Sequence, residues 1–110
     1  MRMVAEHTIP MIRPIIERYI EALRRSGIAP QKVYLYGSYA KGTATADSDI
    51  DLAVVSDDLS GDSFDDDLAL MHLTWDVDTR IEPHSFRPEE FTPDDPEVED
   101  ILETGVPILS

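Results

Sequence analysis

The sequence predicts an α+β domain, in which a small mixed β-sheet carries helices packed on one face. The chain has 110 residues, of which 42% are hydrophobic and 29% charged, a size and balance typical of one soluble globular domain. Apolar residues recur at helical spacing near the N-terminus, and further along the chain short segments rich in β-branched and aromatic residues alternate with helical ones. We therefore expect one domain over residues 1–110.

The first predicted helix covers residues 10–26. Pro10 and Pro14 lie near its start, where a missing N–H costs least, and Gly27 is a plausible end. Its apolar residues follow the i, i+3, i+4, i+7 pattern of an amphipathic helix: Ile12, Ile15, Ile16, Tyr19, Ile20 and Leu23.

Two strands are predicted around a short helical turn. Residues 32–37, KVYLYG, are rich in β-branched and aromatic side chains and end at a glycine. Residues 38–42, SYAKG, form the turn, and residues 49–56, DIDLAVVS, form the second strand. In that strand one face is apolar and the other begins with two carboxylates, Asp49 and Asp51.

A second long helix is predicted from Phe64 to Trp75, with Ser63 as its cap. The aspartates of its first turn, residues 65–67, favour the positive end of the helix dipole. We expect its large apolar residues to lie in the core rather than to form a platform for a nucleobase: Leu68, Met71, Leu73 and Trp75.

The C-terminal third predicts one more strand and one more helix. Residues 79–86, TRIEPHSF, form the strand, and Pro83, which has no N–H to donate, should face a sheet edge or a bulge. Residues 96–105 predict a short helix that ends at a glycine, and residues 106–109, VPIL, a final extended piece.

Charge is distributed unevenly along the chain, whose net charge is −14. Residues 1–43 carry seven Lys or Arg and three Asp or Glu, a net +4, whereas residues 44–110 carry two against twenty, a net −18. An acidic surface repels nucleic-acid phosphates, so we do not expect direct nucleic-acid binding. We expect instead a protein partner with a basic surface.

Cysteine is absent from the sequence, which excludes a disulfide framework and a thiolate zinc site and fits a reducing compartment. The longest apolar runs are a few residues, well short of the roughly 20 needed to cross a bilayer. We therefore expect a cytoplasmic protein without a membrane anchor.

The chemistry-bearing residues lie between positions 37 and 51. Asp49 and Asp51 are two apart on a predicted strand, so their carboxylates point to one side, and their mutual repulsion calls for a hard cation such as Mg²⁺. Gly37 lets the backbone pass close to a ligand, and Ser38 opens a helical turn whose free N–H groups can hold a phosphate.

Gly37 and Ser38 are followed by ten residues and then by Asp49-Ile50-Asp51. The segment GSYAKGTATADSDID therefore resembles the GSx(10)DxD signature of the polymerase-β-like nucleotidyltransferase superfamily, and in particular its small branch, the minimal nucleotidyltransferases. The resemblance implies a nucleotidyltransferase core in which Gly37 and Ser38 hold the triphosphate of ATP, while Asp49 and Asp51 ligate two Mg²⁺ ions.

Members of that superfamily usually have a third catalytic carboxylate, on a neighbouring strand, that also ligates metal. Glu82 is our candidate, because it lies on the third predicted strand, with His84 projecting from the same face. Asp76 and Asp78 remain alternatives from a segment that resembles a loop.

Stand-alone minimal nucleotidyltransferases typically act as antitoxins of a HEPN-family ribonuclease toxin, transferring AMP from ATP to one of its tyrosines. The resemblance thus implies a Mg²⁺-dependent protein adenylyltransferase that forms a hetero-oligomer with such a toxin. Two other functions stay open: a non-catalytic module that masks its partner sterically, and a nucleotidyltransferase acting on a small hydroxylated molecule. The sequence leaves the nucleotide and the acceptor undecided.

Overall fold

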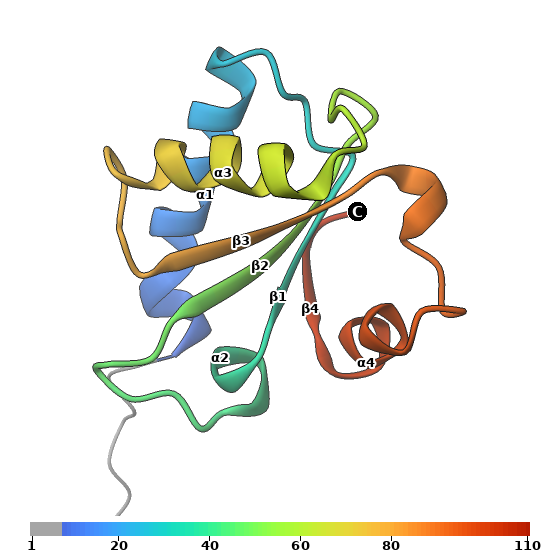
Figure 1. Cartoon of the computed structure of the whole chain (residues 1–110). Coiled ribbons are helices and arrows are strands. Elements are labelled where there is room, and N and C mark those ends of the chain that lie inside the picture. The colour runs from blue at the N-terminus through green and yellow to red at the C-terminus, as the bar shows by residue number, and fades with distance from the viewer. Residues whose placement is uncertain (1–7) are drawn as a thin grey trace, which may run out of the picture.

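The computed structural model describes residues 8–110, in which four strands form one sheet of order β3-β2-β1-β4 (Figure 1). Strands β1 (Lys32–Tyr36) and β2 (Ile50–Val55) are antiparallel, and β4 (Val106–Leu109) pairs antiparallel with the other edge of β1. Strand β3 (Ile81–Phe86) runs parallel to β2. The predicted α+β fold with a small mixed sheet is therefore confirmed.

Helix α1 (Ile9–Arg25) begins and ends within one residue of its predicted bounds. Its predicted stripe is largely buried, and the buried Tyr19 hydroxyl donates a 2.7 Å hydrogen bond to the carbonyl of Leu70 in α3 (Ser63–Thr74). This bond fixes the two long helices to each other over one face of the sheet (Figure 1). Among the residues that the structure describes, no helix has the length and apolar run needed to cross a bilayer.

The N-terminus of α3 is capped by Asp62, whose carboxylate accepts hydrogen bonds from the N–H groups of Phe64 and Asp65 at 3.1 and 3.2 Å. The predicted cap at Ser63 is therefore wrong by one residue, because Ser63 is already helical. The carboxylates of two further aspartates in this region accept hydrogen bonds from outside the helix, in addition to any interaction with its dipole. Asp66 accepts from the Ser60–Gly61 loop, and Asp67 from the N–H of Ser85 in β3.

The second face of the sheet, which the prediction left without helices, is partly covered by α4 (Pro96–Thr104) and by the 3₁₀ turn Pro88–Glu90, so the expectation that the helices pack on one face is wrong for α4 (Figure 1). A smaller apolar cluster joins them to β2 and β3: Ala53, Val55, Phe86, Phe91, Val98 and Ile101. Along β2 the residues facing this cluster are apolar from Ala53 onward, whereas Asp51 precedes them. The cover therefore ends before Asp51, and the N-terminal end of β2 stays open.

The outward face of α3 differs from the prediction. Leu68, Met71 and Trp75 were expected in the core, but they are 42%, 45% and 65% exposed, whereas Leu73 packs against the core as predicted. The buried face of α3 is instead made by residues spaced four apart: Asp66, Leu70 and Thr74. The prediction was wrong because α3 has large apolar side chains on both faces, so its sequence does not indicate which face turns inward.

Candidate active site

The Gly-Ser turn follows directly from β1. Gly37 has φ +75° and ψ −149°, a conformation open to glycine and strained for other residues. The next residues form the short helix α2 (Ser38–Lys41), which Tyr39 anchors in the core with only 3% of its surface exposed. A Cβ at Gly37 would overlap a carboxylate oxygen of Asp51. The two halves of the sequence motif therefore lie in direct contact.

Strand pairing places Asp51 at the centre of a row. In the sheet Asp51 is opposite Tyr36 of β1 on one side and opposite Glu82 of β3 on the other. One side-chain atom able to coordinate a metal from each of Asp51, Glu82 and His84 lies within 4.8 Å of the other two. His84 Nε2 is 3.8 Å from Glu82 Oε1. The ring of His84 also packs on that of Tyr36, at a centroid distance of 5.9 Å.

Asp49 lies one residue before β2, which begins at Ile50 rather than at Asp49 as predicted. Its carboxylate lies close enough to those of Glu82 and Asp51 to raise the pKa of Glu82 and the pKa of Asp51. Asp49 and Glu82 together line a cavity of about 390 Å³. Met71 and Trp75 also line that cavity.

Within residues 8–110, no lysine or arginine forms an ion pair with Asp49, Asp51 or Glu82. Burial, together with the charge of Asp49, raises the pKa of Asp51, and His84 opposes this shift. Contact with Asp49, then burial, then the charges of Asp49 and Asp51 raise the pKa of Glu82. Burial and the Asp51 charge also raise the pKa of the Tyr36 hydroxyl. Crowded carboxylates of this kind are relieved by a bound cation, and their oxygens are the ligands that Mg²⁺ prefers.

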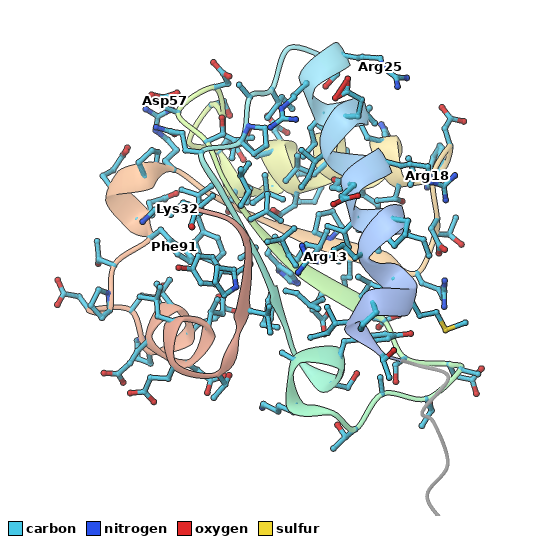
Figure 2. The ribbon with its side chains drawn as sticks, turned by 180° about the vertical axis from the view of Figure 1, so that it is seen from behind. Arg13, Arg18, Arg25, Lys32, Asp57 and Phe91 are labelled. Carbon is cyan, nitrogen blue, oxygen red and sulfur yellow. The ribbon has the colours of Figure 1, made fainter. Side chains whose placement is uncertain are left out.

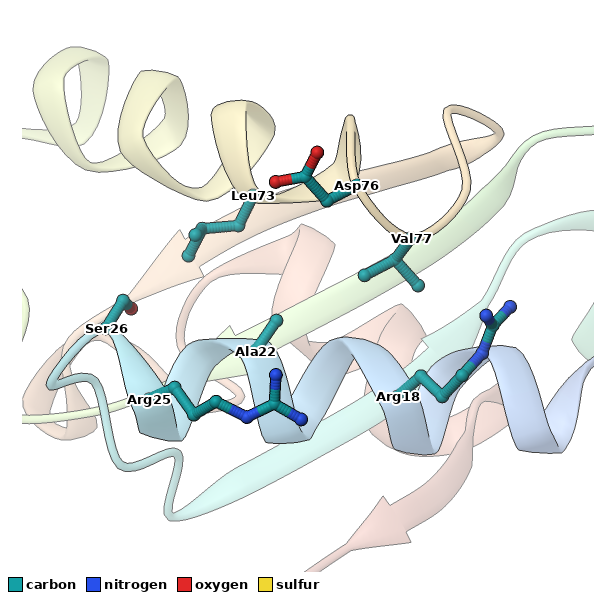
Figure 3. A pocket seen from close by; sticks show the side chains of 7 residues that line it. All are labelled: Arg18, Ala22, Arg25, Ser26, Leu73, Asp76 and Val77. Atoms are coloured by element: carbon teal, nitrogen blue, oxygen red, sulfur yellow. The ribbon is translucent and has the colours of Figure 1, made fainter.

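The alternatives for the third carboxylate lie elsewhere. Asp78 is paired with Arg80 through two contacts of 3.1 and 2.9 Å, which lower the pKa of Asp78. Asp76 lines a separate cavity between α1 and the end of α3, opposite Arg18 and Arg25 (Figure 3). Of the three candidates, Glu82 is the one beside Asp51.

Two residues of the site were missed from the sequence. Tyr36 was treated only as a strand residue, since its position opposite Asp51 depends on strand register. Arg80 lines the cavity with Asp49 and Glu82, and only its nearness to Glu82 in the sequence could have indicated this.

Comparison with known proteins agrees with this geometry. A family model described as a nucleotidyltransferase domain matches residues 16–106, a range that includes the whole site. A search among curated proteins gives no match. The described fold is similar to a chain in the crystal structure of a toxin–antitoxin with AMP-PNP, with a TM-score of 0.62 and 23% identity over 89% of this chain and 73% of that one. It is also similar to a chain of a mutant toxin–antitoxin MntA-HpeT, with a TM-score of 0.60 and 21% identity over 86% and 72% of the two chains. At these identities the two structures show a shared fold.

Proposed function

We propose, from the premise that this chain belongs to the nucleotidyltransferase domain family, that it transfers AMP from ATP to a tyrosine of a HEPN-family ribonuclease toxin and thereby acts as its antitoxin. The observation that carries the proposal is the contact between Gly37 and the Asp51 carboxylate, with Glu82 alongside. This contact places a turn that can bind phosphate next to carboxylates that can coordinate a metal ion.

Gly37 and Ser38 are the proposed nucleotide-binding residues. The missing side chain at Gly37 lets a triphosphate approach the backbone, and the first N–H groups of α2 together with the Ser38 hydroxyl are donors for its oxygens. The similarity in fold to a structure with AMP-PNP supports ATP as the substrate.

Asp49, Asp51 and Glu82 are the proposed catalytic residues and the proposed ligands of two Mg²⁺ ions. The proposal is supported by the close approach of Asp51 and Glu82 and by the charge of Asp49, which raises the pKa of both of those carboxyls. Bound there, Mg²⁺ would neutralise the carboxylates and the triphosphate and polarise the phosphorus that is attacked. His84 and Tyr36 border this set, since His84 Nε2 lies 3.8 Å from Glu82 Oε1 and the ring of Tyr36 packs on that of His84.

The proposed reaction is an in-line displacement. The tyrosine oxygen forms a bond to the α-phosphorus of ATP, the bond from that phosphorus to the oxygen bridging to the β-phosphate breaks, and pyrophosphate leaves with the bonding electrons. A carboxylate oxygen of Glu82, which is exposed at the cavity, accepts the hydroxyl proton. The protein contributes positioning and electrostatics.

The partner is supported by two observations. Both similar structures are described as toxin–antitoxin assemblies. The net charge of −18 over residues 44–110 suits a basic surface, which a protein that cleaves RNA needs for its own substrate.

The test is transfer of labelled AMP from ATP, with Mg²⁺, to a purified HEPN-family ribonuclease toxin. We expect label on a toxin tyrosine, and at least about a 100-fold loss of rate in each of Asp49→Asn, Asp51→Asn and Glu82→Gln. Asp94→Asn, which alters an exposed carboxylate outside this set, should keep the rate.

Absence of label, or equal label with the three cluster variants, would contradict the proposal. Inhibition of the toxin that persists without ATP and with Asp49→Asn and Asp51→Asn would identify a sterically masking antitoxin instead. Pyrophosphate release with a small hydroxylated acceptor alone would identify the small-molecule enzyme.

A further inference from the structure

Helix α3 carries an apolar stripe that no other described element covers. Of the six large apolar side chains that are exposed within residues 8–110, three lie on it and a fourth, Trp75, is its C-cap; these four have exposures of 75%, 42%, 45% and 65%: Phe64, Leu68, Met71 and Trp75. Their spacing of four, three and four residues places them on one side of the helix, opposite its buried face. We name these four residues the α3 stripe.

The α3 stripe ends at the candidate active site. Met71 and Trp75 line the same cavity as Asp49 and Glu82. A helix rises roughly 16 Å from Phe64 to Trp75. The stripe therefore begins beside the carboxylates at Trp75, and its other end, Phe64, lies well away from the place where a bound nucleotide would react. A molecule lying along the stripe would therefore present one end of its surface at Asp49 and Glu82.

The surroundings of the stripe are strongly acidic. Residues 57–78 contain eight aspartates and neither Lys nor Arg, and Asp62, Asp65 and Asp76 flank the two ends of the stripe. Nucleic acid is excluded by this charge. A second copy of the chain is disfavoured as well, because a two-fold contact would set one acidic rim against the other.

We propose that the α3 stripe is the docking surface for the protein that accepts the nucleotide. Its occupant is a protein surface with an apolar patch flanked by Lys or Arg, placed so that a hydroxyl-bearing side chain next to the patch enters the cavity beside Asp49 and Glu82. This assignment rests on the proposed function for the identity of the acceptor. The apolar patch supplies affinity, and the acidic rim selects and orients a basic partner.

The test separates docking from chemistry. The variant Phe64→Gln/Leu68→Gln changes the end of the stripe distant from the cavity, and Met11→Gln/Leu102→Gln is its matched control, since those two side chains are 58% and 37% exposed on other helices. Affinity for the same purified HEPN-family toxin is measured by calorimetry, and AMP transfer to that toxin is measured as kcat and KM. Thermal melting and binding of AMP-PNP with Mg²⁺ are recorded for every variant.

We expect the stripe variant to raise both the Kd and the KM for the toxin at least about ten-fold, with the melting temperature, the affinity for AMP-PNP and kcat at saturating toxin unchanged. The control should match the wild type. Toxin affinity unchanged in the stripe variant would overturn the proposal. Weaker AMP-PNP binding with unchanged toxin affinity would also overturn the proposal, because it would assign the stripe to nucleotide binding. A wild-type dimer that is lost in the stripe variant would overturn it as well, because it would assign the stripe to contact with a second copy of the chain.

Failure of the proposed function gives a different result. If the wild type transfers no AMP but its affinity for the toxin still depends on the stripe, the docking surface stands and the transfer reaction does not. If transfer occurs with the same Kd and KM in the stripe variant, the reaction stands and the docking surface does not.

Discussion

At the scale of single residues, Gly37 is subject to two constraints at once. Its φ of +75° is accessible to glycine, and its Cα lies against the carboxylate of Asp51. Gly42 also has a positive φ, +77°, but its ψ of 17° places it in the left-handed helical region, and a Cβ there would meet nothing within 4 Å. Gly37 therefore has both the more restricted backbone conformation and the closer neighbour.

We predict that Gly42→Ala lowers the free energy of unfolding by about 1 kcal/mol, the usual cost of a left-handed conformation. Gly37→Ala should cost roughly 2–4 kcal/mol, because overlap with Asp51 is added to the strain of a backbone conformation that is essentially restricted to glycine. Nucleotidyl transfer should be lost in Gly37→Ala and kept in Gly42→Ala. Urea denaturation and the AMP-transfer assay check this, and equal losses in the two variants would contradict it.

The raised pKa of Asp51 leads to a pH-dependent prediction. A carboxyl whose pKa is higher in the folded than in the unfolded chain contributes stability below its ordinary pKa, and this contribution is lost as the pH rises through the folded value. At pH 7 the ionised Asp51 therefore opposes folding. We expect Asp51→Asn to raise the melting temperature of the metal-free protein at pH 7 by a few degrees. The corresponding gain in the free energy of unfolding should be about 1 kcal/mol or less, because the site is partly solvated.

The same variant should give no such gain near pH 3, where the carboxyl is protonated in both states. Added Mg²⁺ should raise the melting temperature of the wild type and leave Asp51→Asn nearly unchanged. Asp94→Asn, at an exposed position, is the control, and a gain from Asp51→Asn that did not depend on pH would count against this account.

At the scale of elements, the start of α3 shows how one position decides a cap. Asp62→Ala should lower the free energy of unfolding by about 1 kcal/mol, because two N–H groups lose their acceptor. Ser63→Ala is the matched control, and it should change stability by a few tenths of a kcal/mol, since Ser63 is inside the helix. Urea denaturation of both variants distinguishes the structure's cap from the one predicted from sequence.

Most elements could be predicted because their signals are local. The α1 pattern, the turn after Gly37 and the edge position of Pro83 each depend on a few neighbouring residues, and the structure confirms them. The inward face of α3 could not be predicted, because Leu70 and Met71 are equally apolar and only the docking of α1 onto Leu70 decides between them.

At the scale of the whole molecule, charge is separated in space as well as in sequence. The arginines of α1, including Arg13, Arg18 and Arg25, lie on the helix that faces the viewer in Figure 2. The remaining elements carry nearly all the acids, within a net charge of −14. Such a net charge strains the compact state through self-repulsion.

We predict that raising NaCl from 20 to 200 mM, which shortens the screening length to below about 10 Å, increases the melting temperature by a few degrees. Association with a basic partner should slow over the same range, because the attraction that steers it is screened. Melting curves and stopped-flow binding measure the two effects. A melting temperature that fell with salt would indicate that the ion pairs outweigh the self-repulsion.

The sequence by itself determined the kinds of elements, their order and the motif of Gly37, Ser38, Asp49 and Asp51, because backbone conformation and carboxylate spacing are local properties. Only the tertiary structure decided that Glu82 lies beside Asp51 and that Asp78 forms an ion pair with Arg80. It also decided that the α3 stripe faces outward beside the cavity. Each of these depends on strand register or helix docking, which brings together residues far apart in the chain.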